Sequence, residues 1–258
     1  MRSIWNGSIS FGLVTIPVKM YSASEDHKID LDMLDKNDHS RIKYKRVNES
    51  TGEEVAWKDI VKGYKQDESY IVLTDKDFDQ ANMKKSKTID IEEFINEDEV
   101  ADVLFKKPYF LEPQKDGEKS YNLLKEALLD TKKLGVATFV MRQKEHLSLV
   151  GVYKNALVLH VIRFSDEIRD PGELKLPETK VSKKEVDMAK SLIEQYTEEF
   201  NFDRFKNIYN EQLLKIIKAK SSGKKTKVEK FEAKPTPAKD LMAQLKASLD
   251  KKKKSKAS

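Results

Sequence analysis

Three apolar runs within residues 135–171 constrain the fold more than any other feature of the sequence. They lie at residues 136–141, 147–152 and 156–164, and each is rich in β-branched and aromatic side chains at strand length. Lys154 and Asn155, between the last two runs, suit a tight turn. Because the connections are short, the pattern predicts three sequential antiparallel strands that form a meander.

Strands this apolar must be covered on at least one face. Similar runs occur earlier in the chain, at residues 4–10, 13–21, 70–73, 88–95 and 109–111. We therefore expect a closed or nearly closed β-barrel, in a fold that is mainly β with additional helices. Pro17 lacks an N–H group, so the strand that contains it is expected at a sheet edge or a bulge.

Two helices are predicted within the barrel region. A capping-box pattern from Thr74 to Asp77 predicts a short helix that ends at Ala81. Ser120 is expected to cap a second helix that runs to Thr131. The buried face of this helix is predicted to contain Tyr121, Leu124, Ala127 and Leu128. The residues expected to end it are Lys132, Lys133 and Gly135.

A projecting arm is predicted at about residues 39–66. Residues 42–46 alternate as a basic strand, and residues 55–60 are expected to return beside it as the second half of a long hairpin. The hairpin has little apolar surface to pack into a core. It is therefore suited to reaching across a partner.

The chain changes character in its C-terminal part. The barrel core and its arm are assigned to residues 1–180, and a helical hairpin to residues 181–222. Ser182 begins a capping box for the first helix, which is expected to reach about residue 200, and Asp203 is the expected cap of the second. Residues 223–258 are interpreted as a lysine-rich flexible tail with a short helix near residues 240–249.

Charge is distributed unevenly along the chain. The formal net charge of +5 combines a net of +11 in residues 215–258 with a net of −6 in residues 1–214. A folded part with net negative charge can bind a polyanion only if its lysines and arginines gather on one surface. No Gly-rich phosphate loop, recognition helix or RNA-stacking motif is present in the sequence.

Several classes of function are disfavoured by the sequence. It has no cysteine, which rules out disulfides, thiolate nucleophiles and Cys-ligated zinc, and its four histidines show no helical metal-ligand spacing. We therefore expect no catalytic residue, no metal site and no cofactor. No apolar run is long enough to span a bilayer and the N-terminus lacks a signal-peptide pattern, so a cytoplasmic location without membrane partners is expected.

Separated motifs in the chain resemble the bacterial Ku proteins of non-homologous end joining. These motifs are RSIWNGSISFGLVTIPVKMYSA, MRQKEHLSLVGVY and LVLHVIRFSDEIRDP, with a further match in KPTPAKDLMAQLKASL near the C-terminus. The resemblance covers residues 2 to about 220. It implies a homodimer that threads a double-stranded DNA end through a ring closed by one arm from each subunit. It also implies recruitment and stimulation of an ATP-dependent DNA ligase, and a bacterial, nucleoid-associated protein.

The candidate site residues follow from both lines of argument. Basic residues predicted to contact DNA phosphates without reading bases are Lys43, Lys45, Arg46, Lys84, Lys85, Lys87, Arg142, Lys144 and Arg163. The resemblance assigns the tail to DNA as well, through Lys224, Lys225, Lys251, Lys252, Lys253 and Lys254. It places ligase docking on Leu192, Tyr196, Phe200, Phe205, Tyr209 and Leu213.

Two other classes of function stay open at this point. A metal-dependent nuclease would use carboxylates such as Asp166 and Asp170. A generic RNA-binding or ribosome-associated protein would act through its basic tail, and deleting residues 224–258 would then abolish binding.

Overall fold

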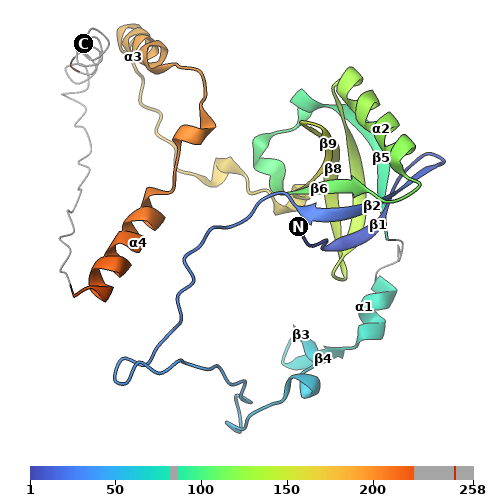
Figure 1. The fold of residues 1–258 in the computed structure, drawn as a ribbon, viewed down its shortest axis with the longest axis vertical. Helices are drawn as coiled ribbons and strands as arrows, with labels where there is room; N and C mark the ends of the chain where they lie inside the picture. Colours follow the sequence, from blue (N-terminus) through green and yellow to red (C-terminus); the bar gives the residue numbers. More distant parts are fainter. Residues whose placement is uncertain (82–86, 224–246, 248–258) are drawn as a thin grey trace. The chain divides into compact units, whose positions relative to one another are not determined.

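The computed structural model describes residues 1–81, 87–223 and 247 (Figure 1). The chain divides into two compact units, Met1–Pro171 and Gly172–Ser258. The described residues do not include the tail and its predicted helix near residues 240–249, except for Ala247. They do not include Lys84 and Lys85 either. None of the helices in the described part of the chain has the length and apolar composition that a transmembrane span requires.

Seven strands form a closed barrel in the order β1-β2-β6-β9-β8-β7-β5, which confirms the predicted fold class (Figure 1). They are β1 (Trp5–Phe11), β2 (Val14–Ser22), β5 (Thr88–Asn96), β6 (Phe105–Pro113), β7 (Lys133–Met141), β8 (Lys144–Tyr153) and β9 (Ala156–Ile162). Neighbouring strands are antiparallel except for β1 and β5. The β7-β8-β9 meander and its Lys154-Asn155 turn are as predicted, since Tyr153 pairs with Ala156.

The expected edge position of Pro17 is wrong, because a closed barrel has no edge. Pro17 lies opposite Ser8 of β1, whereas the pairing of β2 with β6 begins only at Val18. The Ser8 N–H donates to the carbonyl of Lys87, on the side away from β2. The N–H that Pro17 lacks would point toward β6, just beyond the last residue pair between β2 and β6. Its absence therefore costs the barrel no hydrogen bond.

The α2 helix (Glu118–Thr131) covers one end of the barrel. Tyr121, Leu124 and Leu128 are buried in the barrel core, as the helical spacing predicted. Ala127 is exposed, so its predicted burial is wrong. The helix also begins before Ser120, with Gly117 at its N-cap, and so Ser120 is not its cap.

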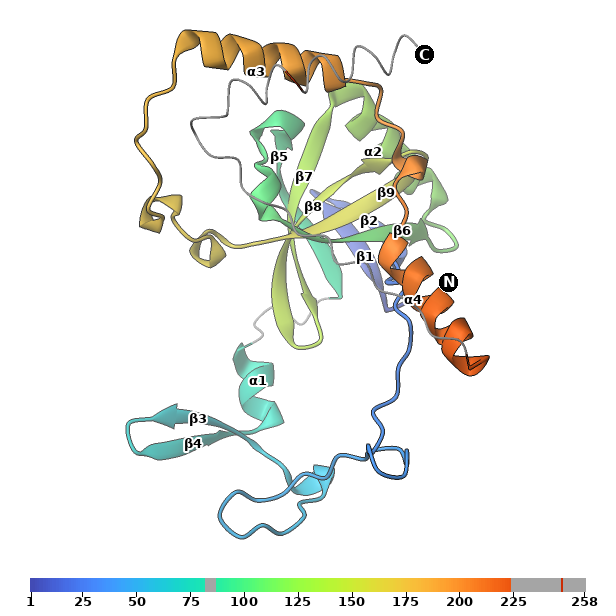
Figure 2. The same cartoon turned by 90° about the vertical axis from the view of Figure 1, so that its left-hand side faces the viewer.

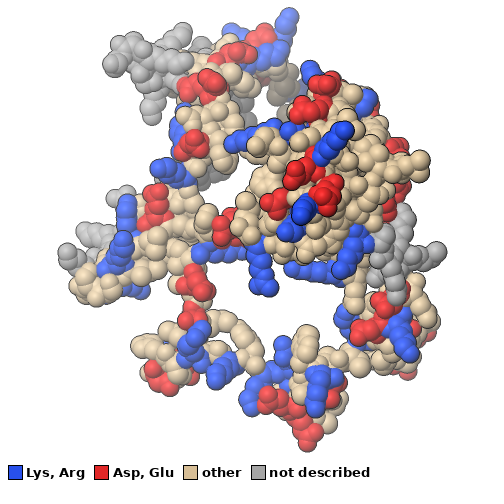
Figure 3. All heavy atoms as spheres, turned by 45° about the vertical axis from the view of Figure 1, so that its right-hand side comes forward, with Lys and Arg blue, Asp and Glu red and all other residues tan. Residues whose placement is uncertain are grey.

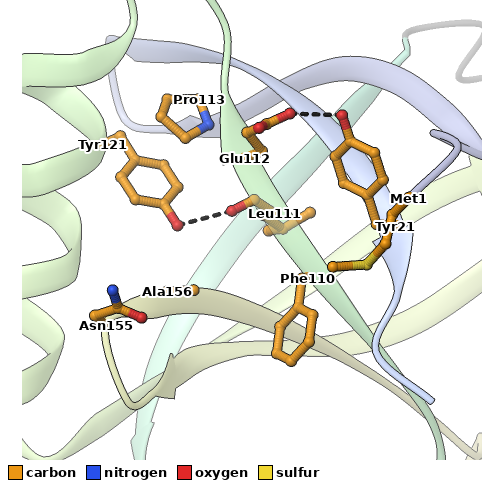
Figure 4. Close-up of a pocket in the computed structure, with 9 residues that line it drawn as sticks. All are labelled: Met1, Tyr21, Phe110, Leu111, Glu112, Pro113, Tyr121, Asn155 and Ala156. Atoms are coloured by element: carbon orange, nitrogen blue, oxygen red, sulfur yellow. Dashed lines mark hydrogen bonds between the residues drawn. The ribbon is translucent and has the colours of Figure 1, made fainter.

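A tyrosine fixes α2 to the strands beneath it (Figure 4). The Tyr121 hydroxyl donates to the Leu111 carbonyl of β6 at 2.7 Å and accepts from the Leu157 N–H of β9, also at 2.7 Å. Burial raises the pKa of this phenol. At the other end of the helix Lys132 takes the left-handed conformation, and Gly135 lies within β7 instead of ending the helix as predicted.

The arm comprises residues 23–87, between β2 and β5 (Figure 2). Its regular elements are η1 (Trp57–Asp59), β3 (Lys62–Gln66), β4 (Ser69–Leu73) and α1 (Asp75–Ala81). The helix and the strand at residues 70–73 are confirmed, and the Asp77 carboxylate accepts the Thr74 N–H at 2.7 Å.

The predicted basic strand at residues 42–46 is wrong. Only isolated bridges flank that stretch, Leu34 with Arg41 and Val47 with Glu54, and the hairpin lies later in the chain, between β3 and β4. Alternating charged residues have no apolar surface to pack against. The backbone hydrogen bonds of a strand pair alone stabilise it too little to keep it formed.

The second unit contains α3 (Lys183–Tyr196) and α4 (Ile208–Ser221). The capping box of Ser182 with Glu185 is confirmed, but α3 ends at Tyr196 instead of continuing to about residue 200. The predicted cap Asp203 lies in the short η6 (Phe202–Arg204), and α4 begins later because the Asn207 side chain accepts the Asn210 N–H. Neither helix has a buried residue, so their packing as a hairpin stays a prediction.

The remaining short helices connect these elements. They are η2 (Glu97–Glu99), η3 (Asp102–Leu104), η4 (Ser165–Glu167) and η5 (Pro171–Glu173).

Candidate nucleic-acid interface

The barrel end opposite α2 gathers basic residues from β6, from β8, from the β7-β8 turn and from the segments just before β5 and just after β9. The register places the start of β6, the β7-β8 turn and the end of β9 together, since Met141 pairs with Lys144 and Ile162 pairs with both Phe105 and Leu147. The arm leaves and re-enters the barrel between β2 and β5. We call the basic side chains carried by this end the basic rim: Lys87, Lys106, Lys107, Arg142, Lys144 and Arg163. Lys and Arg side chains border the lower edge of the barrel in Figure 3.

Arg142 and Lys144 lie at the tip of the rim. Arg142 and Gln143 are the central residues of the β7-β8 turn, with φ of 53° and 62°, the left-handed values that a type I′ turn needs. Both basic side chains are exposed, and neither forms an ion pair with a carboxylate within the described part of the chain. Arg142 therefore offers positive charge outside any ion pair of that part of the chain, whereas Lys144 lies close enough to Glu167 to help lower the pKa of that carboxyl group.

The two lysines at the start of β6 were missed by the sequence analysis. Lys106 binds Glu167 of η4 with an Nζ to Oε2 distance of 2.7 Å. Hydrogen bonds from Lys106 and from the Phe164 N–H lower the pKa of Glu167. Lys107 lies 5.6 Å from the centroid of the Tyr109 ring. The adjacent lysines before Pro108 were the only signal available, because they are close to Arg142 only in the folded barrel.

Arg163 has a structural role that its sequence position did not reveal. Its guanidinium donates to the carbonyl of Val103 at 2.8 Å and to that of Phe105 at 2.7 Å. These bonds join the end of β9 to the start of β6. Arg163 therefore contributes charge to the basic rim, but its main role is to hold these two strand ends together.

A half-buried histidine lies next to the rim. The His146 ring stacks on Phe139 with a centroid distance of 5.3 Å, and Phe139 packs edge-on against Trp5. Burial lowers the pKa of His146, and the nearby charges of Lys144 and Lys106 lower it further, against a hydrogen bond to the Met141 backbone. The imidazole is thus held toward its neutral form.

The basic residues predicted in the arm are exposed, and two of them have partners. Lys45 pairs with Glu54 at 2.7 Å, and the guanidinium of Arg46 lies 4.5 Å from the centroid of the Trp57 ring. Lys43 forms no ion pair among the described residues. The predicted DNA contacts that fall outside the described residues are Lys84, Lys85, Lys224, Lys225, Lys251, Lys252, Lys253 and Lys254.

The predicted ligase-docking residues lie in the second unit and are exposed or half-exposed. Leu192 and Tyr196 lie on α3, and Tyr209 and Leu213 on α4. Phe200 lies between the helices, with its ring centroid 5.9 Å from that of Phe205 and 6.1 Å from that of Phe202.

Asp166, named for the nuclease alternative, lies in η4 beside Glu167. No group of three or more His, Asp or Glu side chains in the described ranges is arranged to hold a metal ion.

The chain matches the family model described as the Ku70/Ku80 beta-barrel domain over residues 10–188. Curated relatives named non-homologous end joining protein Ku are similar over nearly its whole length. The protein from Opitutus terrae is 41% identical over 97% of this chain and 92% of its own. Ku 1 from Saccharopolyspora erythraea is 39% identical, over 96% and 78%. The protein from Coxiella burnetii is 37% identical, over 99% and 96%.

The chain also matches a solved structure, the SPOC domain of human PHD-finger protein 3. The match covers 62% of this chain and 95% of the SPOC domain chain at 14% identity. Its TM-score of 0.30 is too low to bear on the fold.

The closed barrel and the family match define a Ku-type β-barrel protein. The chain belongs to the Ku family.

Proposed function

We propose that this protein binds the ends of double-stranded DNA without regard to sequence, as a ring-forming homodimer in non-homologous end joining. We further propose that it recruits and stimulates an ATP-dependent DNA ligase. The names of its relatives support the pathway. The observation that carries the DNA contact is the basic rim, where Arg142 and Lys144 are exposed and form no ion pair among the described residues.

The chemistry of the rim fits phosphate contact without base reading. Lysine and arginine at strand ends can neutralise phosphates, whereas base readout needs a helix or ribbon that enters a groove. Lys43, Lys45 and Arg46 in the arm would add contacts on the far side of the duplex. The tail lysines would add charge along the backbone.

The arm supports a homodimer. Trp57, Tyr64 and Tyr70 are 72%, 65% and 68% exposed, and no described arm residue is buried. Monomeric proteins rarely leave so much apolar surface in water. A second arm would cover it, and two arms would close the ring.

The exposed aromatic cluster of Phe200, Phe202 and Phe205 supports a docking role for the second unit. Aromatic side chains are typical anchors of protein interfaces. Tyr196, at the end of α3, and Tyr209, at the start of α4, are also exposed.

The decisive experiment compares linear and covalently closed duplexes of equal length and sequence. A threading ring needs an end, so the linear duplex is expected to bind much more tightly, with a salt slope of about −5 if about six phosphates are neutralised. Equal affinity for closed and linear DNA would overturn the ring. Strong dependence on sequence with little dependence on salt would overturn phosphate contact.

A further inference from the structure

One carboxylate lies among the lysines of the basic rim. Glu167, in η4, accepts two hydrogen bonds from the Lys106 ammonium, at 2.8 Å to Oε1 and 2.7 Å to Oε2. Its Oε2 also accepts the Phe164 N–H at 2.9 Å. A second ammonium group, that of Lys144, is near enough to help lower the pKa of this carboxyl group. The protein therefore holds an anion of its own where its cations gather.

The local backbone brings these groups together. The pairing of β6 with β9 shifts between Phe105 and Lys107, which leaves Lys106 as the extra residue of a β-bulge. A bulge takes a side chain out of the regular alternation of the strand and directs it elsewhere. From the other side, Glu167 follows Phe164 by three residues, so its side chain folds back onto the N–H at the start of η4.

The donors that hold Glu167 are those that proteins use to bind phosphate. Lysine ammonium groups and backbone N–H groups make many of the phosphate contacts in protein–DNA complexes. Carboxylates and phosphates both accept strong charge-assisted hydrogen bonds from such donors. The side chains of Lys106 and Glu167 are 32% and 35% exposed, so an anion from solvent can reach the ammonium group.

Glu167 is also the one carboxylate that forms an ion pair with the basic rim, within the ranges that the structure describes. A DNA backbone that approaches the rim must therefore either share Lys106 with this carboxylate or displace it.

We propose that the place held by the Glu167 carboxylate is a subsite for one phosphate of the DNA backbone. Lys106, Lys144 and the Phe164 N–H bind that phosphate, and Glu167 competes with it for these donors. Because one anion replaces another, Lys106 adds less to DNA affinity than an unpaired lysine at the same position. The inference rests on the DNA contact proposed above, to which it adds a competitor built into the protein.

Glu167→Gln tests the competition in the full-length protein. The glutamine carbonyl can still accept the Phe164 N–H, but the negative charge is removed. We expect linear duplex to bind at least threefold more tightly at about 50 mM salt. The salt slope should steepen by about 1, because Lys106 then neutralises a phosphate without leaving a carboxylate unpaired.

Asp166→Asn is the matched control. It removes one negative charge from the same short helix, and Asp166 forms no ion pair in the described part of the chain. Its effect on DNA is therefore limited to long-range repulsion, which salt screens. It should change the affinity less than twofold and leave the salt slope unchanged.

Two further variants identify the groups involved. Lys106→Gln in the Glu167→Gln background should remove both the gain in affinity and the extra salt slope. Glu167→Met removes the hydrogen bond to the Phe164 N–H as well as the charge, and it should still tighten binding, because the charge is what competes. Thermal unfolding checks that each variant is folded.

The outcomes separate this inference from the proposed function. A folded Glu167→Gln protein with unchanged affinity and slope overturns the subsite, and so does a gain that survives Lys106→Gln or is matched by Asp166→Asn. If Arg142→Ala weakens binding while Glu167→Gln does not strengthen it, only the subsite is wrong. If neither substitution changes binding, the rim does not contact DNA and both proposals are overturned.

Discussion

The barrel and the arm use apolar residues in opposite ways. Ile9, Ile16, Val150, Leu157 and Leu159 of the barrel are all 0% exposed, and α2 covers one end of their core. The arm contains residues of the same kind, yet Tyr64, Ile71 and Val72 of its hairpin are all exposed. The closed ladder gives each barrel strand two neighbours, whereas β3 and β4 have only each other.

This difference indicates where each region obtains its stability. A two-stranded sheet is marginal in water unless a further layer covers it. The barrel supplies its own layer, because β1 closes onto β5 and α2 packs on the core. The arm must obtain that layer from a partner, which in our proposal is the arm of a second copy.

The largest expected effect tests this contrast directly. Leu159→Ala should lower the free energy of unfolding of the barrel by about 2–5 kcal/mol, because it opens a cavity in a closed core. Ile71→Ala in the arm should change the same quantity by less than about 0.5 kcal/mol, since the side chain already meets water. Urea unfolding followed by tryptophan fluorescence measures both.

The chain has two tryptophans, Trp5 in the barrel and Trp57 in the arm, so a Trp57→Phe background lets Trp5 report the barrel alone. Sedimentation should show that Ile71→Ala weakens the proposed dimer, whereas Leu159→Ala weakens it only once the barrel unfolds. A large loss of barrel stability from Ile71→Ala would show that the arm is part of the same cooperative unit.

A smaller effect separates two kinds of residue on the basic rim. Arg142→Ala or Lys144→Ala should each reduce affinity for linear DNA a few-fold and reduce the salt slope by about 1, because each removes at most one phosphate contact. Neither should change the unfolding free energy, since both side chains are exposed. Filter binding at several salt concentrations measures the slope.

Arg163→Ala is the internal comparison. It removes two hydrogen bonds to backbone carbonyls, so it should lower the unfolding free energy by about 1–2 kcal/mol. If Arg163→Ala instead weakens DNA binding as Arg142→Ala does, with stability unchanged, then its guanidinium contacts phosphate and the assigned framework role is wrong.

The barrel could be predicted from sequence because its signals are local. The β7-β8-β9 meander repeats the apolar spacing of strands over short turns, and the stripe of Tyr121, Leu124 and Leu128 has helical spacing. The basic rim could be predicted only in part. Lys106 and Arg142 are far apart in the sequence, and only closure of the barrel brings them to one end.

The arm and the α4 cap show a different limit of sequence reasoning. Residues 42–46 alternate like a strand, but an isolated alternating pattern with no layer beneath it does not fix a ladder. Asp203 and Asn207 are both good N-cap residues, and the sequence alone does not say which of them begins α4. In the first case the lack of a supporting layer decides the outcome, and in the second the hydrogen bond from the Asn210 N–H to the Asn207 side chain decides it.

The smallest expected effect concerns the pH dependence of barrel stability. Burial lowers the pKa of His146 below its ordinary value of 6.5, so the unfolded chain binds a proton more readily than the folded one. The free energy of unfolding should therefore be highest above pH 6.5 and should fall as the pH drops below that value, until the folded imidazole is itself protonated. His146→Phe, which keeps a ring against Phe139, should flatten this dependence in the Trp57→Phe background. Because burial also lowers the pKa of His160, part of the slope should survive the substitution. A slope that is unchanged in His146→Phe would show that this imidazole does not couple to the folding of the barrel.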